Sequence, residues 1–75
     1  MGQPTYITIH EDVPGMIAQV TKIFSDAGIN IGTMTVTRES KGEQAIMIIE
    51  TDDYQDDILA KLKQLPHMVN VTYFE

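Results

Sequence analysis

The apolar and polar positions in the first half of the chain change period twice, and each change marks a new element. Residues 6–10 alternate with period two and are rich in β-branched side chains, which is typical of a strand. From about Pro14 to Ala27 the apolar positions recur at helical spacing, and Gly28 follows as a helix C-cap. Residues 29–38 are again β-rich, and Gly32 interrupts their alternation at a point where a bulge fits. The first half therefore predicts a strand, a helix and a strand.

The second half repeats this order after a turn at residues 39–42. A third strand is predicted at residues 44–50, and because its middle is apolar at every position we expect both of its faces to be covered. A second helix is predicted from Thr51 to a stop at Pro66, with acidic residues in its first turn and lysines in its last. Residues 69–73 alternate again and predict a final strand.

The order β-α-β-β-α-β predicts an α+β, ferredoxin-like domain. Two interleaved right-handed β-α-β units form a four-stranded antiparallel sheet of order 4-1-3-2, with both helices on one face. Residues 1–75 are expected to form a single domain with its core at about residues 5–74. The other face of the sheet has no helices, and either Ile46 and Ile48 or their neighbours in the third strand point toward it. In one interpretation a second chain or another domain covers this face; in the other, a small sheet leaves it exposed.

The composition narrows the possible functions. A core of 75 residues is marginal, and without cysteine neither a disulfide nor a thiolate metal site supports it, so association with a partner is expected. The net charge is −6 and the five basic residues are scattered, which argues against a nucleic-acid or membrane surface. No apolar run reaches the length of a membrane span and no signal peptide is visible, so a cytoplasmic location is expected. No cofactor or metal is expected in this chain, and the lack of an evident nucleophile–base pair argues against a free-standing enzyme.

The segment from His10 to Gly15 carries the most chemistry. It combines an imidazole, two carboxylates and the start of a helix, whose free N–H groups favour an anion such as a carboxylate. His10 can donate a hydrogen bond to that carboxylate, Asp12 can pair with an ammonium group, and Asn30 offers both a donor and an acceptor. Together these groups would recognise the zwitterionic head of an amino acid.

Each of these residues also has a purely structural interpretation. His10 at a strand end can be solvated or bonded to the backbone, and Asp12 can cap the following helix. Asn30 can be a turn residue, and Arg38, the only arginine, can be a charge that protects a sheet edge from aggregation. His67 is expected in a loop.

Two stretches at this spacing resemble the ACT domain family. Asp12–Gly15 matches its acidic or amide residue followed by Pro-Gly, and Gly28–Ile31 matches its Gly-(Ile/Val)-Asn-Ile after the first helix. The resemblance spans about residues 5–74 and includes the order of the elements. It implies a regulatory module of amino-acid metabolism that binds a small molecule, with ligand-binding residues at His10, Asp12, Val13, Pro14, Gly15, Met16, Asn30 and Ile31.

Within that family the chain is similar to two serine-linked domains. One is the serine-binding regulatory domain of bacterial phosphoglycerate dehydrogenase, where residues at the positions of His10, Asp12 and Asn30 hold serine across a dimer interface; Asp12 departs from the amide found there. The other is the C-terminal ACT domain of the iron–sulfur L-serine dehydratase β subunit, which is similar in more detail, at residues 30–38, 41–45 and 47–52. This resemblance implies that the cluster and the lyase site lie elsewhere in such a parent enzyme.

The sequence therefore predicts a homodimeric regulatory domain that senses an amino acid, with L-serine as the first candidate, inside a serine-metabolism enzyme. The alternative is a module that binds no ligand and only holds the subunits of such an enzyme together. A sensor would change its association or stability with ligand, whereas an assembly module would keep its dimer when His10 is replaced.

Overall fold

The computed structural model describes residues 2–38 and 43–75 and contains the six predicted elements in the predicted order. The turn predicted at residues 39–42 lies outside the described residues. The second helix begins later than predicted, because Thr51 still belongs to the third strand and its N–H donates to the carbonyl of Pro4 at 2.9 Å. The elements are β1 (Thr5–Glu11), α1 (Met16–Asp26), β2 (Ile31–Arg38), β3 (Gln44–Thr51), α2 (Asp56–Lys63) and β4 (Met68–Phe74).

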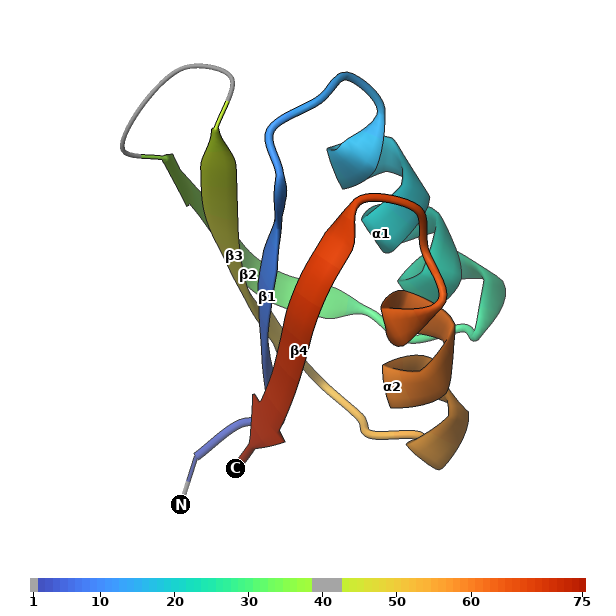
Figure 1. Cartoon of the computed structure of the whole chain (residues 1–75). Helices are drawn as coiled ribbons and strands as arrows, with labels where there is room; N and C mark the ends of the chain where they lie inside the picture. The colour runs from blue at the N-terminus through green and yellow to red at the C-terminus, as the bar shows by residue number, and fades with distance from the viewer. Residues whose placement is uncertain (1, 39–42) are drawn as a thin grey trace.

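The four strands form one antiparallel sheet of order β2-β3-β1-β4, which confirms the predicted topology. Both helices cover the same face of this sheet (Figure 1). The strand β2 is an edge, and its residues Met34 and Val36 share the helix-covered face with Ile49 and Met47, their partners in β3. They nevertheless remain 37% and 42% exposed, whereas Met47 and Ile49 are fully buried. The helices therefore protect the central strands and leave the helix side of β2 open.

The core lies between the two central strands and the inner faces of the helices. Burial of these side chains away from water is the main force that holds the layers together. The ring of Tyr6 meets the ring of Phe24 edge to face, with 5.0 Å between the centroids, so the core is anchored where β1 passes under α1. The most deeply buried apolar side chains are Tyr6, Val20, Phe24, Met47, Ile49, Ile58 and Leu62.

Two glycines shape the connection between α1 and β2. Gly28 has φ +74°, and the N–H of the following Ile29 donates to the carbonyl of Phe24 at 3.0 Å, which together end the helix with a Schellman turn. The pairing of β2 with β3 shifts register between Ile31 and Thr33, on either side of Gly32. The C-cap residue is Ala27 and Gly28 follows it, so the cap lies one position before the predicted one, while the predicted bulge is confirmed.

The third strand is covered on only one face within the described chain. Its residues Ala45, Met47 and Ile49 are buried beneath the helices, but Ile46 and Ile48 on the other face are 41% and 40% exposed. The expectation that both faces are covered is therefore wrong for the single chain, because α1 and α2 pack on the same side of the sheet. Ile46 and Ile48 pair with Ile9 and Ile7 of β1, and we refer to these four residues as the open-face isoleucines.

Candidate functional site

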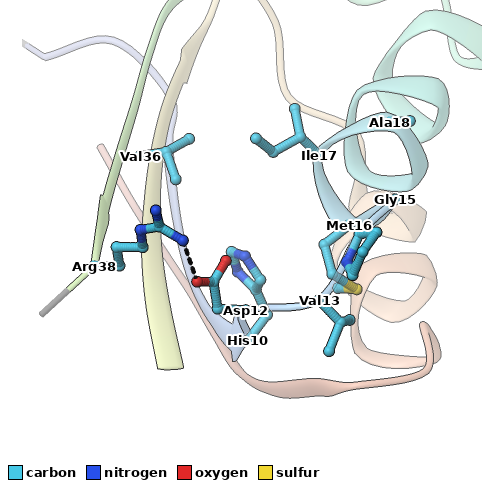
Figure 2. Close-up of a pocket in the computed structure, with 10 residues that line it drawn as sticks. His10, Asp12, Val13, Gly15, Met16, Ile17, Ala18, Val36 and Arg38 are labelled. Carbon is cyan, nitrogen blue, oxygen red and sulfur yellow. Dashed lines mark hydrogen bonds and ion pairs between the residues drawn. The ribbon is translucent and has the colours of Figure 1, made fainter. Parts of the chain in front are cut away.

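A cavity of about 780 Å³ opens between the start of α1 and the end of the edge strand β2. Figure 2 shows that its walls come from three segments: the end of β1 with the loop that follows it, the first turn of α1, and the last residues of β2. We refer to it as the α1 cavity. Its lining residues are His10, Asp12, Val13, Pro14, Gly15, Met16, Ile17, Ala18, Val36 and Arg38.

His10 is the buried polar group of the α1 cavity. It lies near the end of β1, where the pairing with β4 shifts register between Ile9 and His10. The side chain is only 2% exposed, and its Nδ1 has no hydrogen-bond partner among the described residues. A buried nitrogen without a partner is costly, so it favours a water molecule or a ligand that supplies the missing hydrogen bond. The prediction that His10 is solvated or bonded to the backbone finds no support at Nδ1.

Acidification is expected to destabilise the fold through His10. Burial lowers the pKa of His10 below its ordinary value of 6.5, and the nearby carboxylate of Asp12 opposes this shift only in part. His10 in the unfolded chain therefore binds a proton at a higher pH than His10 in the folded chain. The free energy of unfolding should fall as the pH drops through 6.5 toward the lower folded-state pKa. Urea denaturation of the wild type and of His10→Gln at several pH values measures this contribution. Parallel pH profiles of the two proteins would contradict it.

Asp12 and Arg38 form an ion pair at the rim of the α1 cavity. The Arg38 guanidinium donates from Nη1 to Oδ2 of Asp12 at 2.7 Å, and this contact joins the end of β2 to the loop after β1 (Figure 2). Within the described chain no side chain caps the N-terminus of α1, so the alternative that Asp12 is the helix cap is wrong. The N-cap position belongs to Gly15, whose φ of +91° turns the chain into the helix.

The N-terminus of α1 adds a positive partial charge to the same cavity. The first N–H groups of a helix have no intrahelical acceptor, and in α1 the bond from the Gln19 N–H to the Gly15 carbonyl, at 3.0 Å, is the first of the ladder. The first turn contains no acidic residue, so within the described chain no carboxylate of α1 itself neutralises this end. The cavity therefore combines a donor-rich end of a helix, an imidazole and one ion pair with walls that are otherwise mostly apolar.

The predicted site residues separate into two groups. His10, Asp12, Val13, Pro14, Gly15 and Met16 line the α1 cavity together. Asn30 and Ile31 follow the other end of α1, about 16 Å away at 1.5 Å per residue for this 11-residue helix. There the amide of Asn30 donates to Oδ2 of Asp52 at 3.1 Å. One copy of the chain therefore does not bring Asn30 or Ile31 into its own cavity.

Four lining residues were not predicted: Ile17, Ala18, Val36 and Arg38. Val36 and Arg38 could have been found from the sequence, because every second residue of the strand β2 points to the same face of the sheet. Once β2 is recognised as an edge strand with Met34 and Val36 facing the helices, Arg38 must lie on that face as well. The interpretation of Arg38 as a charge that only protects a sheet edge overlooked this register.

His67 lies in the loop between α2 and β4, as predicted, and ties this loop to the end of β1. Its Nδ1 is 2.7 Å from Oε1 of Glu11, and its carbonyl accepts the Glu11 N–H at 2.9 Å. In the described ranges no three His, Asp or Glu side chains gather as a metal ion would require. None of the described helices has the length and apolar character needed to cross a membrane.

Comparison with known proteins points to one family. Residues 7–73 match the family model described as the AHAS small subunit-like ACT domain. A Bacillus subtilis (strain 168) protein named "Probable L-serine dehydratase, beta chain" is 40% identical over 70 residues, which are 92% of this chain and 32% of that protein. The D-3-phosphoglycerate dehydrogenase of the same organism is 41% identical over 71 residues, which are 93% of this chain and 13% of the dehydrogenase. The predicted resemblance to these proteins is confirmed, and the chain spans a third or less of their length.

The fold is shared with proteins of much lower sequence identity. The ACT domain from GTP pyrophosphokinase of Chlorobium tepidum superposes with a TM-score of 0.69 at 19% identity, over 99% of this chain and 100% of that chain. At this identity the likeness shows the fold and leaves the ligand to be argued from the α1 cavity itself.

Proposed function

This chain belongs to the ACT family as an AHAS small subunit-like ACT domain, and from that premise we propose that it binds a free amino acid in the α1 cavity. Binding would regulate an enzyme of amino-acid metabolism of which the domain is a part. L-Serine is the first ligand we propose, since a relative that is 40% identical is named as an L-serine dehydratase beta chain. On this proposal the parent is such a dehydratase, located in the cytoplasm, and any iron–sulfur cluster lies outside this chain, which has no cysteine.

The observation that carries the proposal is the unpartnered Nδ1 of His10 in the wall of the cavity. The imidazole is neutral at pH 7, because burial lowers its pKa, and a neutral imidazole supplies one donor and one acceptor. A carboxylate placed between His10 and the start of α1 would gain a hydrogen bond from each.

Amino-acid binding is expected to depend far more on His10 than on His67. In an amide chemical-shift titration, L-serine should cause saturable shifts at His10, Gly15 and nearby residues, with D-serine and the other L-amino acids as comparisons. His10→Ala should weaken binding by about 1–3 kcal/mol, because the partner group of the ligand loses its hydrogen bond. His67→Ala, an exposed histidine outside the cavity, is the matched control. Absence of any shift with all twenty L-amino acids would refute the sensor.

We also propose that the functional unit is a homodimer. Asn30 lies at the far end of α1 from the cavity of its own chain, so it can serve as a ligand-binding residue only in the cavity of another copy. The small core and the absence of cysteine leave association as a source of added stability. A ligand held between two copies acts on the parent enzyme only through its different affinities for their arrangements.

The open-face isoleucines favour a second candidate function, assembly without ligand. They form an apolar centre on the uncovered face of the sheet, and a second copy stacked on this face would meet no like charge at that centre. An assembly module would associate equally well with and without amino acids, and His10→Ala would not alter its association. A sensor would change its association constant or its melting temperature with the ligand.

A further inference from the structure

The ion pair between Asp12 and Arg38 stands at the rim of a cavity whose other side chains are mostly apolar. Its two members come from different parts of the fold, Asp12 from the loop after β1 and Arg38 from the last position of β2. Figure 2 shows the guanidinium reaching across the gap between these segments toward the carboxylate. Val13, Met16 and Val36 supply much of the remaining wall. A positive and a negative group are thus presented side by side to whatever enters.

These two charges are complementary to the head group of an α-amino acid. An ammonium group is a natural partner for the Asp12 carboxylate, and a guanidinium binds a carboxylate through two parallel N–H donors. The unpartnered Nδ1 of His10 lies in the same wall, and the first turn of α1 presents its free N–H groups nearby. In the described structure the two charged groups contact each other at 2.7 Å.

We propose that Arg38 binds the carboxylate of the ligand and Asp12 its ammonium group, so that the amino acid takes the place of the Asp12–Arg38 ion pair. This inference rests on the proposed amino-acid site and adds Arg38 to it as the residue that determines specificity. The Arg38 side of the pair is 52% exposed, and solvent screening keeps the contribution of such an ion pair to stability small. The side chain of Arg38 is long and flexible, so its guanidinium can turn from Asp12 to a ligand carboxylate at the same rim.

Replacing the pair makes recognition depend on both ends of the ligand at once. A molecule with only a carboxylate would free Asp12 from Arg38 and leave it facing a second negative charge. A molecule with only an ammonium group would leave Arg38 without an anion. The α1 cavity therefore discriminates α-amino acids from the corresponding amides and 2-hydroxy acids, while its apolar walls contact the side chain.

A crossed titration tests this assignment with three probes: L-serine, L-serinamide, which lacks the carboxylate, and L-glycerate, which has a hydroxyl in place of the ammonium group. Arg38→Gln should lower the affinity for L-serine and L-glycerate by about tenfold or more and leave the affinity for L-serinamide unchanged or improved. Asp12→Asn should lower the affinity for L-serine and L-serinamide and leave L-glycerate unchanged or improved. Arg38→Lys keeps the positive charge but loses the two parallel N–H donors. Its affinity for L-serine should therefore lie between that of Arg38→Gln and that of the wild type.

Lys22→Gln is the matched control, since it removes one positive charge from an exposed ion pair with Asp26 on α1, outside the cavity. Should another L-amino acid bind more tightly than serine, its own amide and 2-hydroxy acid replace the serine analogues. If the wild type binds L-serine but Arg38→Gln binds it equally well, or loses all three probes equally, the role of Arg38 is overturned and the amino-acid site stands. If the wild type binds none of the amino acids, both proposals fall.

Discussion

Replacing Phe24 by alanine is expected to leave most of the domain unfolded at room temperature. Phe24 belongs to α1, and its fully buried ring meets the ring of Tyr6 of β1 edge to face. It therefore joins the helix layer to the centre of the sheet. Truncating a buried phenylalanine costs about 3–5 kcal/mol. A single core in a chain this small rarely supplies more than about 3–5 kcal/mol in total. Far-ultraviolet circular dichroism with a thermal melt measures the loss of secondary structure and of stability.

Ile17→Ala provides the control for this experiment. Ile17 belongs to the same helix but is 45% exposed, so its truncation removes little buried apolar surface and should leave the melting curve near that of the wild type. A Phe24→Ala protein that melts cooperatively near the wild-type temperature would contradict the view that one contact region under α1 dominates the stability.

On the alternative function, assembly through the open face of the sheet, the second large effect is expected at Ile48. Replacing Ile48 by glutamate should reduce self-association through this face by at least about 100-fold, because a carboxylate buried in an apolar interface loses its hydration without gaining a partner. The fold of the single chain should survive, since the side chain of Ile48 is 40% exposed and points away from the core. Sedimentation velocity at several protein concentrations measures self-association, and a thermal melt measures the stability of the fold.

Ser25→Glu adds the same charge on the exposed surface of α1, away from the open-face isoleucines, and should leave association unchanged. If Ile48→Glu associates as strongly as the wild type, the open face is not where copies meet. Contacts through the edge strand β2 and its neighbouring cavity would then account for any dimer that persists.

The parts of this fold that follow from local rules could be predicted from the sequence. Gly28 ends α1 in the left-handed conformation because few other residues tolerate it, and Gly32 marks a register shift that the pattern of apolar positions already shows. The strand order followed from the order of the elements and the handedness of their connections. Six of the eight predicted ligand-binding residues lie together because they are neighbours in the chain.

The features that depend on contacts between distant segments could not be predicted in the same way. Arg38 lies 26 positions from Asp12, and only the pairing of β2 with β3 brings them to the same cavity. The second face of β3 is exposed in the single chain, because apolar composition shows that a face avoids water, but not which molecule covers it. The distance of Asn30 from the cavity follows from the length of α1, but its contact with Asp52 is a product of the folded chain.

The two β-α-β halves of this domain use equivalent positions in different ways. In the first half, the space between the start of the helix and the end of the edge strand is the α1 cavity. In the second half, the ring of Tyr54, just before α2, packs on Tyr73 of β4 with 4.3 Å between centroids, and both lie against Tyr6. Burial raises the pKa of Tyr6 to about 12, whereas burial lowers the pKa of His10. On the proposed function, only the first of these two equivalent positions leaves room for a ligand among the described residues. Saturation should then occur at a stoichiometry of one ligand per copy.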